Sequence, residues 1–500
     1  MKNMPFLFLL FFCSVLKAQK EDHVWLFSHT YGLPEATQLD FNYTPPELVT
    51  VEREMYLMAT NASICDEDGN LLMYTNGIWI ADKLGEMMEN GDSLNPGDWA
   101  NAAGDAGYVV AQGAFFIQKP GNDNLYYLFH MFQDYLGGGV PLTKFYYSLI
   151  DLGFNNGLGK VVEKNVPLLT GDYLLNYNQA TAVRHANGRD WWIVVPNHMQ
   201  PQYFRFLLTP EGIQGPWMQE IGFKEPTDNW WDYSFGHRIF SLDGVRFADY
   251  DFLNYIQIFD FDRCTGLLSN PVKIDYQLDP SWNNGDAAIA FSPSGRFLYM
   301  TRAKNGYELV QYDVLSPDIQ ESEQVLVFCN EPNGLICGIG NMLLGPDGRI
   351  YVDAGDTIAF HVINKPDSLG LACEFSYKGF PFPVSYPNGI MPYFPNYRLG
   401  ALEGSECDSI TSSAEVLVRP TAFFIGSPNP ASGPVTLQYE LPEGSNGYFI
   451  VSDIMGREIE RHFVEEPVGL LRLASYDSGL YLIRLVVDGK VVQSEKLIQY

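Results

Sequence analysis

Aromatic and acidic residues gather in one stretch of the chain, DNWWDYSFGH at residues 228–237. Trp230, Trp231, Asp232 and His237 in this stretch have side chains that can stack on sugar rings and hydrogen-bond to hydroxyl groups. His198 directly follows a predicted strand, in PNHMQPQYF. We take these five residues as candidates for ligand binding. The alternative is that the aromatic rings fill a core and that the histidines only make structural hydrogen bonds.

Motifs that mark common catalytic sites do not occur in this sequence. It has no His-Glu-x-x-His zinc motif, no Gly-x-Ser-x-Gly elbow, no phosphate-binding glycine loop and no dinucleotide fingerprint. Glycoside hydrolysis needs two carboxyl groups at a set separation, and among 60 Asp and Glu residues the sequence singles out no pair. The catalytic residues are therefore unknown at this level, and a binding protein is favoured over an enzyme.

One acidic segment, DEDGN at residues 66–70, is faintly similar to a calcium loop. The EF-hand spacing fails, because no glutamate falls where the twelfth position would need it. A tight turn between two strands is the favoured interpretation. No cofactor is identified, and Ca²⁺ is the one ion that remains open.

Cysteines offer a second kind of chemistry. Leaving aside Cys13 near the N-terminus, six remain, and an even number permits disulfides in an exported protein. Cys329 and Cys337 are close enough to staple a loop, and Cys373 with Cys407 would tie a chain end. The sequence does not determine the pairing, and for Cys65 and Cys264 the alternative is that they are buried free thiols. No Cys-x-x-Cys pair occurs and no histidine stands at ligand spacing, so no metal site is predicted.

The elements that position these residues repeat along the chain. Six segments share a short apolar strand, a polar turn with glycine, and a second strand rich in aromatic residues. Asn-Gly, Asp-Gly and Ser-Gly supply the positive φ angles that tight hairpins need. The turn glycines, spaced by about 50 residues or somewhat more, are Gly69, Gly121, Gly188, Gly244, Gly295 and Gly348.

Strands such as WWIVV at 191–195 are hydrophobic throughout, which is typical of strands covered on both faces. A small sheet of three or four such strands buries both faces only when copies stack on either side of it. The repeat therefore predicts an all-β fold with a six- or seven-bladed β-propeller over residues 19–404. Residues 23–60 and 364–400 hold further strand material, which we expect to combine to close the ring or to add a seventh blade.

Four segments support this prediction by resemblance: CDEDGNLLMYTNG, KPGNDNLYYLF, GPDGRIYVDAGDTIAFHVINKPDSLGLACEF and FPNYRLGALEGSECD. They resemble segments of uncharacterised exported propeller-like proteins, in which a propeller precedes a C-terminal sorting domain. FSPSGRFLYMT also resembles a blade motif shared by WD40-like, lactonase-like and quinoprotein-like propellers. These resemblances imply the fold and say little about chemistry.

The two ends of the sequence predict export. Residues 1–18 read as a signal peptide, with Lys2, an apolar run and Ala18 at a small-residue position. Residues 405–426 read as a linker, and residues 427–500 as a small antiparallel β-sandwich of short strands and hairpin turns. This last unit begins with the turn cluster SPNPASG.

The last unit resembles the type A C-terminal sorting domain of the type IX secretion system. The matching segments are SPNPASG, VSDIMGRE, SGLYLIRL and KLIQY, and the matching residues are Pro428, Asn429, Pro430, Gly456, Gly479, Tyr481 and Lys496. The resemblance implies passage through the periplasm of a Gram-negative bacterium and recognition by an export machine at the outer membrane. It also implies that the protein is secreted or displayed at the cell surface.

The net charge and the apolar segments of the sequence limit the classes of partner that we expect. The net charge of −29 disfavours nucleic acid, because such a surface repels phosphate backbones. No stretch after the signal peptide is long and apolar enough for a transmembrane anchor. The sequence thus predicts an exported propeller that binds glycans or surface proteins. The alternative is an extracellular hydrolase or lactonase-type enzyme with metal-binding carboxylates at the mouth of the propeller.

Overall fold

The structure of the chain is a computed structural model. The chain divides into two compact units, residues 1–409 and residues 410–500, and each is described by itself. The structure describes residues 19–29, 35–57, 59–108, 110, 112–133, 142–169, 180–197, 200–223, 236–251, 255–276, 288–303, 306–329, 341–354, 358–382, 391–407, 422–425, 431–441, 447–453, 457–464, 468–487 and 490–500.

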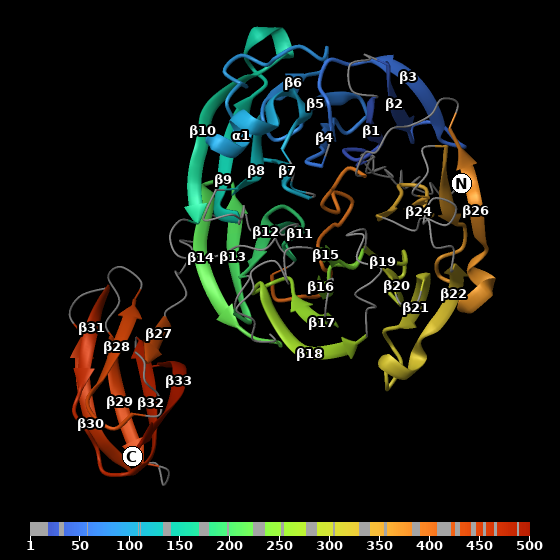
Figure 1. Ribbon diagram of the computed structural model, residues 1–500. Coiled ribbons are helices and arrows are strands. Elements are labelled where there is room, and N and C mark those ends of the chain that lie inside the picture. The colour runs from blue at the N-terminus through green and yellow to red at the C-terminus, as the bar shows by residue number, and fades with distance from the viewer. Residues whose placement is uncertain are drawn as a thin grey trace, which may run out of the picture. The chain divides into compact units, whose positions relative to one another are not determined.

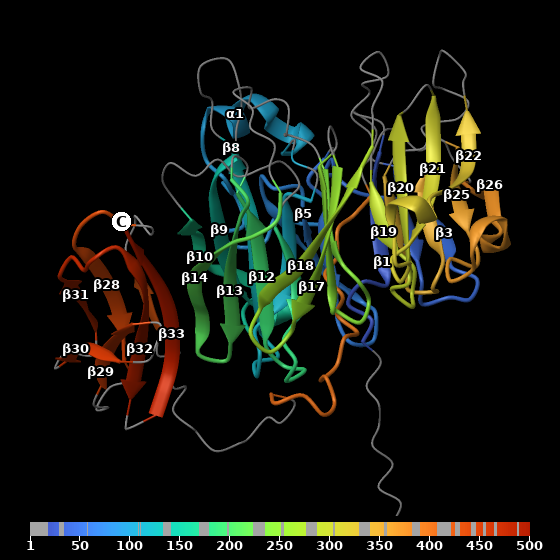
Figure 2. The ribbon, with the colours of Figure 1, turned by 90° about the horizontal axis from the view of Figure 1, so that it is seen from below.

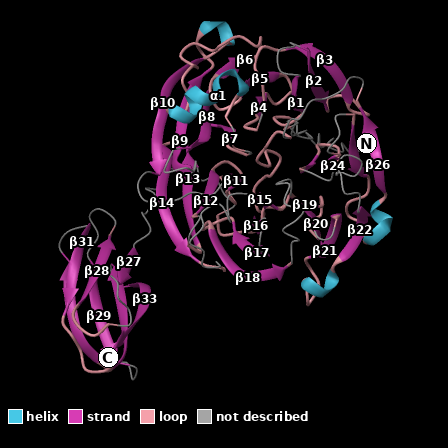
Figure 3. Ribbon diagram, in the orientation of Figure 1, coloured by secondary structure: helices cyan, strands magenta, loops and turns pink. Residues whose placement is uncertain are grey.

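The described part of the first unit forms seven antiparallel sheets arranged around a central channel, as the blades of a β-propeller (Figure 1). Within each blade the strands follow one another in chain order, and the first strand of the blade is the innermost. Inner strands of successive blades contact one another, as β15 does with β11 and β19. Strands dominate this unit and helices are short (Figure 3). The predicted propeller is confirmed, with seven blades.

The bounds of the strands in blades 1 to 4 are as follows. Blade 1 holds β1 (Val24–His29), β2 (Glu35–Asp40) and β3 (Glu47–Glu52), and blade 2 holds β4 (Ala62–Cys65), β5 (Leu71–Thr75) and β6 (Ile80–Asp82). Blade 3 holds β7 (Ala114–Gln118), β8 (Leu125–Gln133), β9 (Leu142–Asp151) and β10 (Lys160–Leu169). Blade 4 holds β11 (Thr181–Arg184), β12 (Trp191–Pro196), β13 (Gln202–Thr209) and β14 (Gly212–Glu220).

Three further blades and a few short helices complete the first unit. Blade 5 holds β15 (Gly236–Phe240), β16 (Arg246–Asp251), β17 (Tyr255–Asp262) and β18 (Leu267–Asp275). Blade 6 holds β19 (Ile289–Phe291), β20 (Phe297–Ala303), β21 (Tyr307–Asp313) and β22 (Gln324–Cys329), and blade 7 holds β23 (Met342–Leu344), β24 (Ile350–Asp353), β25 (Ala359–Ile363) and β26 (Phe375–Pro381). The helices among the described residues are α1 (Asp98–Ala103), η1 (Gly104–Ala106), η2 (Asn155–Gly157), η5 (Gln320–Ser322) and η6 (Gly370–Cys373).

The six predicted turn glycines occupy the same place in blades 2 to 7, between the first and second strands. All six have positive φ, from +69° at Gly295 to +89° at Gly69, as the hairpin interpretation requires. The repeat seen in the sequence is therefore the blade itself. Figure 2 shows the strands of the blades running side by side across the thickness of the ring.

Strand β12 shows why the blades need hydrophobic residues throughout. All six of its residues are buried. Successive side chains point to opposite faces of the sheet, so Trp191 joins a cluster with Phe116 of blade 3, whereas Trp192 joins a cluster with Phe259 of blade 5. Each blade thus contributes one face to each of its neighbours.

An aromatic cluster between blade 1 and blade 7 closes the ring. The ring centroid of Trp25 lies 5.6 Å from that of Tyr351, and Phe41 lies 5.7 Å from the same tyrosine. Residues 23–60 supply an additional blade, blade 1, which is one of the two outcomes expected for them. In the part of the chain that the structure describes they share no sheet with residues 364–400, because β26 is the outer strand of blade 7. Side-chain packing between complete blades makes the closure, and no shared sheet is needed.

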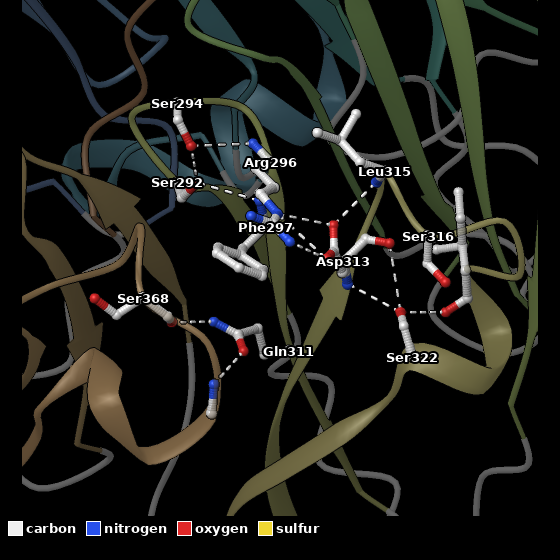
Figure 4. A network of polar contacts seen from close by, with 12 residues as sticks. Ser292, Ser294, Arg296, Phe297, Gln311, Asp313, Leu315, Ser316, Ser322 and Ser368 are labelled. Carbon is white, nitrogen blue, oxygen red and sulfur yellow. Dashed lines mark hydrogen bonds and ion pairs between the residues drawn. The ribbon is translucent and has the colours of Figure 1, made fainter.

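Hydrogen bonds add to the packing between blades, as Figure 4 shows for blades 6 and 7. The Gln311 side chain of β21 donates from Nε2 to the Ser368 carbonyl (2.8 Å) and accepts from the Gly370 amide at Oε1 (2.7 Å). Within blade 6, Arg296 forms an ion pair with Asp313, 2.8 Å between Nη2 and Oδ2. Because Ser368 and Gly370 lie between β25 and β26, one side chain fixes two blades.

The second unit is a small antiparallel sandwich of two sheets, as predicted. Leu437 and Leu473 of one sheet share a buried core with Phe449 and Ile483 of the other. One sheet holds β27 (Ala422–Ile425), β28 (Val435–Glu440) and β31 (Val468–Leu473). The other holds β30 (Glu458–Val464), β29 (Gly447–Asp453), β32 (Gly479–Val487) and β33 (Lys490–Gln499).

The boundary between the units differs from the one expected. Strand β27 pairs with β28, although it lies inside residues 405–426, where the sequence predicts a linker. The residues that lead up to SPNPASG therefore already belong to the sandwich. A short strand can be seen in this mixed polar segment of the sequence, but nothing local shows that it pairs with β28.

Three of the residues that resemble the sorting motif lie on paired strands of the second unit. Gly479 begins β32, Tyr481 pairs with Leu497, and Lys496 of β33 pairs with Leu482. Pro428, Asn429, Pro430 and Gly456 lie outside the described residues, as does the predicted signal peptide. Among the residues that the structure describes, no helix is both long and apolar enough to span a bilayer.

Candidate functional site

A segment without regular secondary structure, residues 391–407, crosses the central channel, and we call it the strap (Figures 1 and 3). Tyr393 binds the two blades on either side of blade 3: its amide donates to the Asn61 carbonyl of blade 2 (3.3 Å), and its hydroxyl donates to Oγ1 of Thr181 in blade 4. The Tyr397 hydroxyl donates to the Phe116 carbonyl of blade 3 (2.6 Å). Both tyrosine side chains are buried.

The second half of the strap contacts turns of blades 4 and 5. Nδ2 of Asn396 donates to the Leu242 carbonyl (2.7 Å), and the Leu402 amide donates to the Ala186 carbonyl (2.8 Å). Arg263 of blade 5, also buried, donates to carbonyls of the strap and of blade 4, those of Gly400 and Arg184. Burial lowers the pKa of Arg263 to about 10, and the guanidinium stays charged at neutral pH.

Two repeat glycines make room for this half of the strap. A Cβ at Gly188 would lie 2.5 Å from the Ala401 nitrogen, and one at Gly244 would lie 2.7 Å from Cδ2 of Leu399. Any larger residue would also be strained there, because φ is +73° and +72°. The turns of blades 4 and 5 are thus shaped for both the hairpin and the strap.

A disulfide between Cys264 and Cys407 holds the end of the strap to the β17–β18 turn of blade 5. This finding corrects two predictions from the sequence: Cys407 does not pair with Cys373, which is a buried free thiol, and Cys264 is not free. The bridge joins residues 143 positions apart, and nearness in sequence could not reveal it. Cys65 is free and buried, as expected. Cys337, and with it the proposed Cys329–Cys337 bridge, lies outside the described residues.

The strap leaves a cavity of about 90 Å³ beside it, which we call the channel cavity. Apolar residues from the inner strands of blades 5 to 7 make most of its lining, among them Ile239, Phe291 and Met342. Its polar lining includes Asp22 and Arg398, whose Oδ1 and Nη1 lie 2.5 Å apart in an ion pair. This volume is below the roughly 300–1,000 Å³ of pockets that bind drug-sized ligands.

His237 is the one predicted binding residue that the structure describes, and it lines the channel cavity. Its Nδ1 accepts a hydrogen bond from the Ile289 amide (3.1 Å), so the neutral ring carries its proton on Nε2. Burial lowers the pKa of His237 to about 3. A neutral histidine with so low a pKa is a poor general base near pH 7, but it can donate a hydrogen bond. Trp230, Trp231, Asp232 and His198 lie outside the described residues.

The DEDGN segment is a turn, as the sequence favours. Oδ1 of Asp66 accepts hydrogen bonds from the amides of Asp68 (3.0 Å) and Asn70 (2.9 Å), and Gly69 has φ of +89°. The carboxylate that would begin a calcium loop therefore holds the hairpin. Across the part of the chain that the structure describes, no three His, Cys, Asp or Glu side chains cluster as a metal site.

A second cavity, of about 100 Å³, lies at the turns of blades 3 and 4, and we call it the turn cavity. Tyr397 of the strap forms part of its wall, with Glu21, Gln118, Arg184 and Trp191. Burial raises the pKa of Glu21 to about 7, although the positive charge of Arg184 opposes the shift. Nothing in the sequence marks these residues, because they come from four separate segments and only the fold brings them together.

We expect Glu21→Gln to stabilise the first unit at pH 8 and to change little at pH 4. The raised pKa means that the folded state holds the Glu21 proton more tightly than the unfolded state, so stability falls as pH rises from about 4.5 to 7. A shift of this size corresponds to at most about 3 kcal/mol, and partial exposure reduces the expected gain to about 1–2 kcal/mol. Denaturant unfolding of both proteins at pH 4 and 8 checks this, and a gain of equal size at both pH values would contradict it.

No family model matches the chain, and no curated protein matches it. Several solved structures are similar in fold. One is described as a putative 6-phosphogluconolactonase from Bacteroides uniformis ATCC 8492, with 15% identity and a TM-score of 0.45, covering 74% of this chain and 98% of that one. A second putative 6-phosphogluconolactonase, from Bacteroides fragilis NCTC 9343, has 13% identity and a TM-score of 0.42, covering 74% and 97%.

A third similar structure is the β-propeller domain of Myceliophteria thermophila Cps50, with 9% identity, a TM-score of 0.37 and coverage of 64% of this chain and 87% of that one. A β-propeller domain is thus among the similar structures. Similarity at this level concerns the fold alone and carries no argument about a reaction or a ligand.

Proposed function

We propose that this protein is an exported binding module. The second unit delivers the propeller through the type IX secretion system of a Gram-negative bacterium, and the propeller then binds a glycan or a surface protein outside the cell. The resemblance of residues 427–500 to a type A sorting domain supports the delivery role. The compact sandwich supports it too, because the matching residues Gly479, Tyr481 and Lys496 lie together on two paired strands.

The strap is the observation that carries the binding role. In the alternative, an extracellular hydrolase or lactonase-type enzyme, carboxylates would gather at the axial mouth of the propeller. Here Tyr393 and Tyr397 occupy the channel beside blades 2 to 4, and their hydroxyls bond to the inner strands. The described residue best suited to proton transfer there, His237, is held neutral by burial. The geometry thus favours recognition over acid–base chemistry.

Removing the second unit tests the delivery role. We expect a chain truncated after Ser409 to fold its propeller and to remain in the periplasm, because it keeps the strap and Cys407 but loses the whole sandwich. Cell fractionation and surface proteolysis of producing cells measure this. A matched control carries Phe463→Ser, an exposed residue of the sandwich, and should be exported normally. Surface appearance of the truncated chain would contradict the delivery role.

A glycan array probed with the full chain, beside a panel of hydrolase and lactone substrates, tests the binding role. Binding without turnover is the expected result. Turnover that depends on a divalent cation would favour the enzyme alternative instead.

A further inference from the structure

The channel cavity follows strand β15 along the inner wall of the propeller. Its lining includes His237, the second residue of β15, and Phe240, the last, which an extended strand places roughly 10 Å apart. Strands β19 and β23 line the cavity beside β15, and residues 393–396 of the strap complete its wall. A volume of about 90 Å³ over that length makes the cavity a narrow slot.

Apolar surface is accessible in this slot. Six large apolar residues that line it are only partly buried: Ile239, Phe240 and Leu242 of blade 5, Leu343 and Leu344 of blade 7, and Phe394 of the strap. A guest molecule that covers their accessible surface removes it from water, and this favours the binding of an apolar group.

The polar side chains of the lining are engaged within the protein. Asp22 and Arg398 form an ion pair, and Oγ1 of Thr181 accepts the hydrogen bond of the Tyr393 hydroxyl. Asn396 uses Nδ2 for a carbonyl of blade 5 (2.7 Å) and Oδ1 for an amide of the strap (3.1 Å). The charge in the lining is therefore balanced, and a charged guest gains little there.

His237 adds one N–H group to the slot, on Nε2, because its Nδ1 is held by the Ile289 amide. An ordered water molecule inside a protein needs about two to four polar partners. A slot whose polar groups are largely engaged thus favours an apolar guest over water.

We propose that the channel cavity binds a short unbranched aliphatic group, which lies along β15 and against Phe394 of the strap. An engineered cavity of about 150 Å³ lined by Leu, Ile and Phe binds benzene, so about 90 Å³ admits, in proportion, about four carbon atoms. The narrow shape favours a linear chain over a ring. This inference does not depend on the proposed binding of a glycan or surface protein, because its ligand is apolar and its site is inside the channel.

Xenon is the first probe, because it enters small apolar cavities in proteins. The xenon resonance in ¹²⁹Xe NMR should shift in a saturable manner when the full chain is present. n-Butane should displace the xenon, and benzene should displace it at least tenfold less effectively. Both competitors are apolar, so a difference between them reports on the size and shape of the slot.

Two variants change the slot in opposite directions. Ile239→Trp fills it and should weaken the displacement of xenon by butane at least tenfold, whereas Ile459→Trp, at an exposed residue of the second unit, should leave it unchanged. Leu344→Ala enlarges the slot and should let benzene displace xenon as well as butane does. Leu371→Ala, at an exposed leucine of blade 7, is its matched control and should keep the preference for butane.

Failure of butane to displace xenon, or equal displacement in Ile239→Trp and the unmodified chain, would overturn the site. Equal displacement by butane and benzene from the unmodified chain would overturn the unbranched aliphatic ligand. Near-UV circular dichroism checks that the variants fold, and the benzene response of Leu344→Ala decides the question if Ile239→Trp does not. The glycan array tests the proposed binding function separately, so either proposal can fail alone.

Discussion

Trp25→Ala should lower the free energy of unfolding of the propeller by about 3–5 kcal/mol. Trp25 is fully buried, its ring centroid lies 4.8 Å from that of Phe41 and 5.6 Å from that of Tyr351, and its Nε1 donates to the Asp22 carbonyl (3.1 Å). Removal of the indole ring would leave an empty space at the interface where the first and last blades meet. Loss of contacts there should release blade 1 together with blade 7.

Denaturant unfolding followed by tryptophan fluorescence measures this change, because all nine tryptophans lie before residue 283 and report only on the propeller. Trp25→Phe is the matched control: it keeps most of the packing and should cost less than half as much. Trp79→Ala is a further comparison, since that residue is only partly buried. Equal losses for Trp25→Ala and Trp79→Ala would show that ring closure does not depend on this cluster.

Removing the disulfide with Cys264→Ser and Cys407→Ser should lower the stability of the propeller by about 2–5 kcal/mol. The bridge joins residues 143 positions apart. Without it the unfolded chain regains the conformational entropy of this long loop, and this gain favours the unfolded state. The strap should also detach more readily, since it has no sheet of its own to hold it. Unfolding with and without dithiothreitol measures both effects.

Reductant should destabilise the unmodified chain more than the double variant, and the difference should equal the stability lost in the double variant. The free thiols Cys65 and Cys373 provide the control, because burial raises the pKa of both and keeps them unreactive in the folded state. Equal sensitivity of both proteins to dithiothreitol would contradict a stabilising role for the bridge.

The repeated part of the fold was predictable because each blade carries a local signal. A turn glycine such as Gly244 needs positive φ, and the strands around it are hydrophobic on both faces, so sequence neighbours reveal the unit. The ring closure was not predictable in the same way. Trp25 and Tyr351 meet across more than 300 residues, and nothing near either residue marks the other.

The candidate site shows the same limit. His237 was predicted to bind a ligand, and it lines the channel cavity, but it is the second residue of β15 and its Nδ1 is already held by the Ile289 amide. The strap lies outside the repeat, and the run of tyrosine and proline in MPYFPNYRLG was the one signal that could have indicated it. Nothing in the sequence marked Glu21 or Arg184 as residues of a site, because an isolated charged residue in a strand or turn is usually exposed to solvent.

The Cys264–Cys407 bridge also determines how the propeller bears mechanical load. Cys407 lies two residues before the end of the first unit, so tension applied through residues 410–500 reaches the covalent bond before it reaches the rest of the strap. The force then passes into the β17–β18 hairpin of blade 5, whose strands are paired along their length. Tyr393 and Tyr397 are thereby shielded from the pull, and the channel stays closed while the tail of the chain is under strain.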